Sequence, residues 1–193
     1  MRIISGKYKG KQLNELKFDH VRPTADKVKQ ALFTKFQFDI PESRVLDLFC
    51  GTGALGIEAL SRGAKEVVFV DKSPKSVNLT KKNLKMIGEE AKVYCVSFDI
   101  ALQRVEGKFD FIFIDPPYKS GLYEKALSLI ADRKLLNEKG VIICEHLKID
   151  KFDYSPFEVV DEKTYGTVML TFLSYNWCCT VFNFFNYNVR MKI

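Results

Sequence analysis

The sequence predicts an α/β protein built on a mostly parallel sheet. Short apolar runs alternate with helical patterns along the chain, as in repeated strand-helix-strand units. The first strand-like run leads through a glycine turn into a helix, and several runs end in an acidic residue. Two last runs, 157–165 and 167–175, meet at Gly166 and are typical of a β-hairpin, which adds one antiparallel strand.

Length and composition are those of a soluble globular protein. With 193 residues, 47% hydrophobic and 28% charged, we expect a basic arm and helix over 1–40, a main domain over 41–175, and an aromatic, asparagine-rich extension of unknown role over 176–193. No stretch approaches the roughly 20 apolar residues of a membrane span, and no secretory signal is recognisable, so we expect a cytoplasmic protein. Five cysteines without a CxxC pair indicate buried thiols and no metal site.

Positive charge is concentrated at the beginning of the chain. Residues 1–30 hold eight Lys or Arg against three acidic residues, while the whole chain has a net charge of +6. Such a bias is expected of a segment that contacts a polyanion, although a merely solvated basic terminus has the same composition. The candidate residues for contact with a nucleic acid, which the resemblance described below identifies as RNA, are Arg2, Lys7, Lys9, Lys11, Arg22, Thr24, Lys27 and Lys29.

Residues 1–13 are interpreted as one or two short strands or a loosely ordered arm, because Gly6 and Gly10 interrupt them. A helix follows, with Thr24 as its N-cap and an apolar stripe that packs on the main domain. We expect this helix to present Lys27 and Lys29 outward.

The run Val45–Phe49 predicts a strand buried on both faces, followed by a turn through Gly51 and Gly53 into a helix. Glycines at such a turn let backbone amides approach a nucleotide. Asp47 makes the pattern more specific, because a carboxylate beside the turn would repel a pyrophosphate and favour a cationic ligand. S-adenosylmethionine has a sulfonium, an ammonium and no phosphate, so it fits. A plain turn capped by Asp47 is the alternative.

The next two strands supply further candidates for the cofactor site. Strand 66–71 ends at Asp71, at the spacing of a ribose-binding carboxylate, and a helix follows from Ser73 to Gly88. Strand 92–96 precedes Asp99, which we place at a strand end as either an acceptor for the adenine amino group or a loop cap. Phe49, Lys72 and Ile100 adjoin these residues and complete the predicted cofactor site.

The fourth strand, 109–114, runs into Asp115, Pro116, Pro117 and Tyr118. Two prolines hold the Asp115 carboxylate and the Pro116 carbonyl as fixed acceptors that can grip an NH2 group and direct its lone pair at a methyl donor. Tyr118 offers a face for stacking of a planar base. A capped Pro-Pro turn is the structural alternative. A helix over 122–131 and a fifth strand over 140–145 follow, so the predicted order has no helix between the third and fourth strands.

The sequence resembles bacterial RNA guanine-N2 methyltransferases of the RsmD type, which act on 16S ribosomal RNA of the small subunit. The resemblance covers most of the chain through four stretches: MRIISGKYKG at 1–10, RPTADKVKQALF at 22–33, VLDLFCGTGALGIEALSRGA at 45–64 and DPPY at 115–118. Cys50 and Thr52 stand where the family usually has alanine and serine, and the segment 174–193 extends past its usual end.

The resemblance implies a Rossmann-like class I methyltransferase fold with a seven-stranded sheet and S-adenosylmethionine as donor. It also implies a guanine 2-amino group as acceptor, held by residues 115–118, in ribosomal RNA or the small subunit. We expect a monomer. Three alternatives stay open: the same chemistry on adenine N6 or a glutamine amide, a non-catalytic assembly factor that binds nucleic acid, and a dinucleotide oxidoreductase, which Asp47 disfavours.

Overall fold

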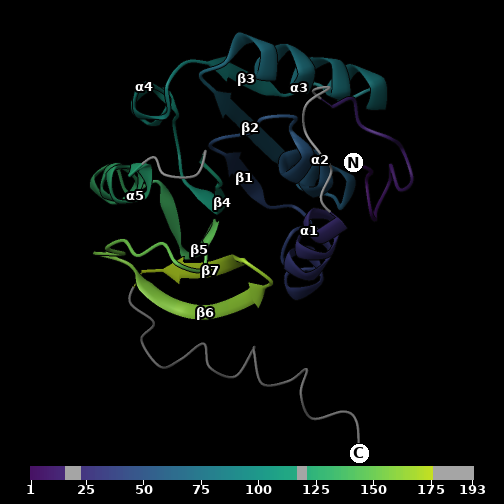
Figure 1. The fold of residues 1–193 in the computed structure, drawn as a ribbon. Coiled ribbons are helices and arrows are strands. Elements are labelled where there is room, and N and C mark those ends of the chain that lie inside the picture. The colour runs from purple at the N-terminus through teal and green to yellow at the C-terminus, as the bar shows by residue number, and fades with distance from the viewer. Residues whose placement is uncertain (16–22, 117–120, 176–193) are drawn as a thin grey trace, which may run out of the picture.

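A seven-stranded sheet in the order β3-β2-β1-β4-β5-β7-β6 runs through the centre of the computed structural model (Figure 1). The structure describes residues 1–15, 23–116 and 121–175. The strands are β1 Arg44–Asp47, β2 Glu66–Asp71, β3 Lys92–Cys95, β4 Phe109–Ile114, β5 Leu136–Leu147, β6 Glu158–Tyr165 and β7 Val168–Ser174. The helices are α1 Pro23–Lys35, α2 Ala54–Ser61, α3 Pro74–Ile87, α4 Phe98–Arg104 and α5 Leu122–Asp132. The predicted α/β class is confirmed.

Strand direction also follows the prediction. The neighbouring strands from β3 to β5 are parallel, and β7 is antiparallel to both β5 and β6. Gly166, with φ +63°, turns the chain between β6 and β7. The carboxyl ends of β1, β2, β4 and β5 therefore lie at one edge of the sheet, which is where α/β proteins bind their ligands.

Successive side chains of the central strands point to opposite faces of the sheet, which divides the core into two layers. Val45 faces one hydrophobic cluster and the next residue, Leu46, faces the other. The first cluster contains buried side chains of α1, α2 and α3, and the second contains those of α4 and α5. Helices thus cover both faces, as the two sides of the sheet in Figure 1 show, and this explains why the strand runs are apolar throughout.

Two predicted elements need correction. A helix, α4, lies between β3 and β4, where the sequence analysis placed none. It has only seven residues, and its three buried side chains, Phe98, Ala101 and Leu102, make too short a pattern for recognition. The fifth strand begins at Leu136 rather than Gly140, because a bulge opposite Phe109–Phe111 accommodates polar residues that look like a loop.

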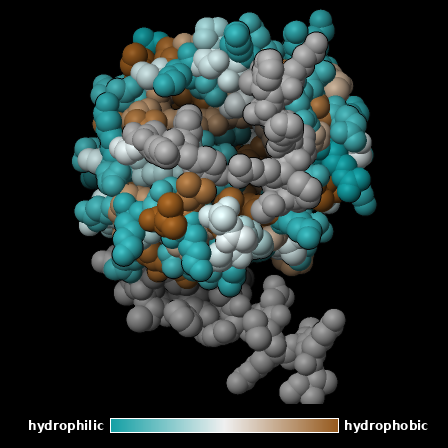
Figure 2. Space-filling view, viewed as in Figure 1, coloured by the Kyte–Doolittle hydropathy of each residue, from teal (hydrophilic) through white to brown (hydrophobic). Residues whose placement is uncertain are grey.

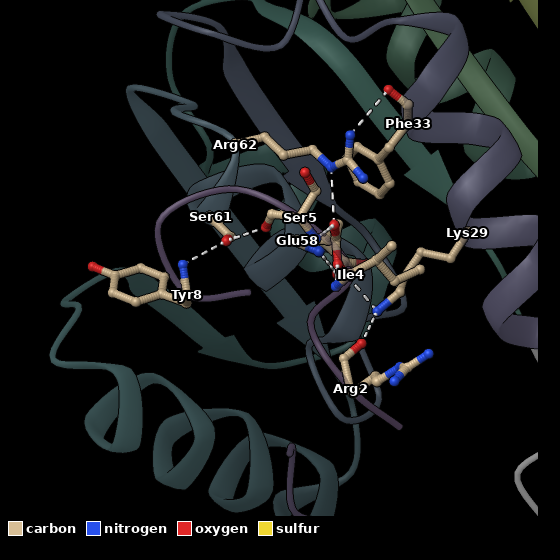
Figure 3. Close-up of polar contacts among 11 residues, drawn as sticks. Arg2, Ile4, Ser5, Tyr8, Lys29, Phe33, Glu58, Ser61 and Arg62 are labelled. Atoms are coloured by element: carbon tan, nitrogen blue, oxygen red, sulfur yellow. Dashed lines mark hydrogen bonds and ion pairs between the residues drawn. The ribbon is translucent and has the colours of Figure 1, made fainter. Parts of the chain in front are cut away.

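The N-terminal segment is packed on α2 and is not a loosely ordered arm. Its apolar residues Ile3, Tyr8 and Leu13 are buried in the core, and an isolated bridge joins Arg2 to Gln12. The Tyr8 amide donates to Ser61 Oγ at 3.0 Å (Figure 3). Of the two interpretations that the sequence allowed, short strands and a loosely ordered arm, the bridge favours the first. The apolar positions are too few and too widely spaced to show the docking.

Glu58 on α2 is the centre of this attachment. Its side chain is fully buried and accepts from the Ile4 amide at 2.8 Å, the Ser5 amide at 3.0 Å and Arg62 Nε at 2.9 Å (Figure 3). Lys29 Nζ lies 3.3 Å from Glu58 Oε2. A buried carboxylate needs this number of donors, because burial without partners would cost several kcal/mol.

The predicted outward position of Lys29 is therefore wrong. Only 3% of Lys29 is exposed, and its Nζ donates to the Arg2 carbonyl at 2.7 Å. Burial lowers the pKa of Lys29, and Glu58 opposes that shift. Lys29 holds the first residues of the chain against α1 and α2. Helix α1 also begins at Pro23, so Thr24 lies inside the helix rather than at its N-cap.

Candidate active site

Asp47 is buried at the carboxyl end of β1, where the glycine turn begins. Its Oδ2 accepts from the Gly56 amide at 3.0 Å, which fixes the carboxyl beneath the first turn of α2. Burial, together with the nearby charge of Asp71, raises the pKa of Asp47 to about 7. In the protein alone this carboxylate has no cationic partner among the residues that the structure describes, so a cationic ligand would complete it.

The glycine turn is open on one side and held firmly on the other. A Cβ on Gly51, which has φ +54°, would meet nothing within 4 Å, so the backbone faces open space there. Behind the turn, α3 supplies two buried side chains: Thr80 donates to the Gly51 carbonyl at 3.0 Å, and Asn83 donates to the Thr52 carbonyl at 2.9 Å. The turn is therefore already formed before a ligand binds.

Asp71 ends β2 on the other side of the turn. Its Oδ2 accepts from the Gly51 amide at 3.0 Å and its Oδ1 from the Ser73 amide at 2.7 Å. The carboxylate is half-buried, and the neighbouring Lys72 is exposed. Asp71 thus fixes the turn, and its location beside Gly51 suits the ribose contact that the sequence predicts.

Asp115 follows β4 directly, two residues beyond the position opposite Asp47. The pairs Asp47–Phe113 and Ile114–Cys144 in the sheet bring Asp115 beside Glu145 of β5. Burial raises the pKa of Asp115 well above its usual value, and the charges of Glu145 and Asp47 add to the effect. Burial also raises the pKa of Glu145. Pro116 is buried behind them, while Pro117 and Tyr118 lie outside the described residues.

Four acidic side chains, Glu15, Asp47, Asp115 and Glu145, line one cavity of about 250 Å³ beside the glycine turn, the N-terminal segment and α1, whereas Asp71 does not line it. Its lining includes Asp47, Phe49, Gly51, Asp115 and Glu145. The face of the molecule drawn in Figure 2 is hollowed near its centre. Asp47 and Gly51 of the predicted cofactor site therefore meet Asp115 of the predicted amine clamp at one edge of the sheet.

Asp99 and Ile100 lie differently from the prediction. Asp99 is in the first turn of α4 rather than at a strand end, and its Oδ2 pairs with Lys125 Nζ at 2.9 Å. Hydrogen bonds from Ser97 and Lys125 lower the pKa of Asp99 to about 2. Ile100 is 44% exposed. Neither residue lines the cavity, although Phe98 beside them packs on Phe49, with ring centroids 5.4 Å apart.

The donor set of the cavity fits S-adenosylmethionine. Buried carboxyl groups with raised pKa values attract a ligand with positive charge and repel a phosphate. Within residues 1–15, 23–116 and 121–175, no three His, Cys, Asp or Glu side chains are grouped so that they could hold a metal ion. Cys50 is buried beside the turn and burial raises the pKa of its thiol, which makes it a poor nucleophile.

Comparisons with known proteins give the family. A family model described as Conserved hypothetical protein 95 matches residues 1–174. Ribosomal RNA small subunit methyltransferase D of Haemophilus influenzae is 38% identical over 175 residues, which cover 87% of this chain and 90% of that protein. The chain belongs to this methyltransferase D family. A Bacillus subtilis protein assigned as an rRNA methyltransferase is 42% identical over 76% of this chain and 82% of its own length.

The fold of the methyltransferase D family is present throughout the matched region. A solved Escherichia coli structure assigned as a methyltransferase superposes with a TM-score of 0.82 at 29% identity, covering 91% of this chain and 98% of that one. The seven-stranded class I methyltransferase fold that the resemblance implied is thus confirmed. The match of the family model ends where β7 ends, at Ser174, and residues 176–193 lie outside the described residues.

The predicted RNA-binding residues of this family member fall into two groups. Those exposed in the structure are Arg2, Lys7, Lys9, Lys11 and Lys27. Lys7 is close enough to pair with Glu89, at 3.4 Å. Lys29 is buried, Arg22 lies outside the described residues, and nothing is described of the Thr24 side chain. No helix of the described chain is long and apolar enough to cross a membrane.

Sequence reasoning missed three contributors to the site. Glu145 was recognised only as the end of a strand, yet it lies beside Asp115 in the cavity. Thr80 and Asn83 were assigned to a helix without a role. The signal for Glu145 was present, because an acidic residue at the end of a buried parallel strand follows the same rule that identified Asp47 and Asp115.

Proposed function

We propose that this chain is an S-adenosylmethionine-dependent methyltransferase that methylates the exocyclic N2 amino group of a guanine in small-subunit ribosomal RNA. One observation supports this most directly: Asp47, the glycine turn and Asp115 line the same cavity. The relatives named rRNA small subunit methyltransferase D supply the substrate class. A ribosomal substrate implies a cytoplasmic enzyme, which we propose acts as a monomer.

The residues around the glycine turn would hold the cofactor. The Asp47 carboxylate would pair with the methionyl ammonium, and Gly51 leaves room for close approach of the ligand to the backbone. Asp71 lies beside the turn to accept from the ribose hydroxyls. Phe49, Lys72, Gly53, Asp99 and Ile100 stay predicted members of this site. The chemistry that S-adenosylmethionine supplies when bound is an electrophilic methyl group on a sulfonium.

Residues 115–118, which we call the Asp115 corner, would hold and activate the amine. The Asp115 carboxylate and the Pro116 carbonyl accept hydrogen bonds from the two N–H groups of the guanine amine, which orients the nitrogen lone pair. Methyl transfer would form the bond from nitrogen to the methyl carbon as the bond from that carbon to the sulfonium sulfur breaks, with its electron pair left on the sulfur. The nitrogen would then carry a positive charge and would have to lose a proton. Burial and the charges of Glu145 and Asp47 raise the pKa of Asp115, which makes its carboxylate a stronger base for that proton. Pro117 and Tyr118 complete the proposed base site.

Transfer of a labelled methyl group tests the proposal. Purified protein is incubated with labelled S-adenosylmethionine and, separately, assembled small subunits, naked ribosomal RNA, DNA and a glutamine-bearing protein. We expect label in RNA, in a methylguanine that mass mapping finds absent from cells lacking the protein. Label confined to DNA or protein would refute the guanine assignment. An active Asp115→Asn variant would refute the role of the corner.

A further inference from the structure

A cavity of about 550 Å³ forms a groove between α1 and the β6–β7 hairpin, beside the proposed catalytic cavity. The sequence analysis gave this hairpin no functional role. The groove has two walls. The sequence spacing of the residues in each wall shows that one wall is a face of a helix and the other is a face of a strand. We call it the α1–β6 groove.

The helical wall comes from α1. Besides Leu32, its members are Lys27, Gln30, Ala31, Thr34 and Lys35. Their spacing of three and four residues places them on one side of the helix. The other side of α1, with Val28, Leu32 and Phe33, is buried in the core. The apolar side of α1 is therefore already packed in the core. Its polar side, with lysine, glutamine and threonine, stays available to line the groove.

The strand wall comes from alternate residues of β6. Asp161, Lys163 and Tyr165 lie two positions apart, so their side chains share one face of the strand. Phe172 of β7 pairs with Asp161 across the hairpin and forms an apolar part of the lining. Tyr165 is half-buried, so part of its ring stays accessible.

The charges of the groove favour an anion. Three lysines line it against one aspartate. Asp161 holds Lys35 with its Oδ2 at 2.6 Å and Lys163 with its Oδ1 at 3.4 Å. One carboxylate cannot neutralise three ammonium groups, so positive charge remains, mostly at Lys27 and Lys163, which are both exposed.

The groove also adjoins the proposed active site. Leu32 lines both the groove and the catalytic cavity, so α1 is the partition between them. An RNA that inserts one base into the catalytic cavity has flanking nucleotides within reach of the outer side of α1. Lysine with glutamine and threonine is the set of side chains that contacts phosphates and sugars, and an aromatic ring accommodates an unpaired base.

We propose that the α1–β6 groove binds the sugar-phosphate backbone of the RNA that flanks the target nucleotide, with Lys27 and Lys163 as the principal phosphate contacts. This surface extends the RNA interface from the N-terminal segment to the C-terminal hairpin. The proposal rests on the proposed function for the identity of the RNA.

Binding at several salt concentrations provides the test. Naked small-subunit ribosomal RNA and assembled small subunits are the probes, and the variants are Lys27→Ala, Lys163→Ala and the double change. Lys92→Ala is the matched control. Lys92 of β3 is 66% exposed and its Nζ lies 3.4 Å from Glu66, and Lys163 is similarly 55% exposed with its Nζ 3.4 Å from Asp161. Strands β3 and β6 are the opposite edges of the sheet.

Each lost phosphate contact lowers the slope of log K against log salt by about 0.7 for single-stranded nucleic acid, which is about fivefold in affinity at 0.1 M salt. We expect this loss in Lys27→Ala and in Lys163→Ala, a doubled slope change in the double variant, and none in Lys92→Ala. Lys163→Arg should keep both affinity and slope. The KM for RNA should rise while kcat at saturating RNA and the affinity for S-adenosylhomocysteine stay constant.

Three results would overturn the inference: groove variants that bind like Lys92→Ala, a lost affinity with an unchanged salt slope, or a loss seen with assembled subunits but not with naked RNA. The last would mean that the groove contacts a ribosomal protein. Wild-type protein that binds RNA with the expected slope changes but transfers no methyl group would refute the proposed function and leave the groove assignment standing.

Discussion

Replacement of Asp47 by asparagine tests whether the buried charge of Asp47 destabilises the protein in the absence of a cationic ligand. Asparagine has nearly the same shape, and its Oδ1 can still accept from the Gly56 amide, as Asp47 does at 3.0 Å. What changes is ionisation: the pKa of Asp47 rises from 3.8 in an unfolded chain to about 7 in the fold, chiefly through burial.

The sign of the effect on stability follows from proton binding. Between pH 3.8 and 7 the folded protein holds a proton on Asp47 that the unfolded chain releases, so the free energy of unfolding falls as the pH rises through this window and is level above it. A difference of about three pKa values, at about 1.4 kcal/mol each, makes the full penalty about 4 kcal/mol. Below pH 3.8 the penalty vanishes.

Urea denaturation of both proteins from pH 5 to pH 8, with the thiols kept reduced, measures this difference. We expect Asp47→Asn to be more stable than wild type by about 2 kcal/mol at pH 5 and about 4 kcal/mol at pH 8. Calorimetry should show that the same variant binds S-adenosylhomocysteine more weakly at pH 8. A stability difference that does not grow with pH would refute the electrostatic reasoning.

Three further predictions concern the attachment of the N-terminal segment and the catalytic corner. Glu58→Gln removes the carboxylate that accepts from the buried donors around Glu58, so urea denaturation should show that the free energy of unfolding falls by about 3 kcal/mol. A fall below about 1 kcal/mol would contradict the role of Glu58 in holding the N-terminal segment. Gly6 and Gly10 have φ of +82° and +86°, but a Cβ on Gly6 would lie 1.8 Å from the Ser61 carbonyl oxygen while one on Gly10 meets nothing within 4 Å. Gly10→Ala should therefore cost about 1 kcal/mol of backbone strain and Gly6→Ala clearly more, and equal costs would mean that the segment does not dock on α2 as described. Asp115→Asn should slow methyl transfer by about 100-fold or more and leave affinity for S-adenosylhomocysteine within about twofold, because the corner contacts the amine; a parallel loss of affinity would place Asp115 in the cofactor site.

The fold was predictable because its signals are local. The central strands are buried on both faces, so they appear as continuous apolar runs, and the turns after them carry glycines whose φ values, such as +54° at Gly51, require them. Asp47 and Asp115 were predictable for a related reason: a polar residue that ends a buried parallel strand must lie at the ligand edge of the sheet.

The failures have two other causes: contacts between distant segments, and a helix too short for its pattern to be recognised. Lys29 has the sequence context of an exposed lysine, and only the approach of Glu58, 29 positions later, makes its burial affordable. Asp99 could not be located correctly without the helix that contains it. The groove that Lys163 and Tyr165 line depends on the return of the hairpin beside α1, which no local pattern predicts.

The Glu58 cluster limits how such enzymes can be recombined. Residues 1–35 look like a separable module. However, the Ile4 and Ser5 amides and Lys29 all contact Glu58 of α2, the helix that follows the glycine turn of the proposed cofactor site. A chimaera that takes this region from a relative must take Glu58, Ser61 and Arg62 with it, or it will leave charges stranded in the interior. The proposed RNA-binding segment and the helix beside the proposed cofactor site would therefore have to be exchanged together.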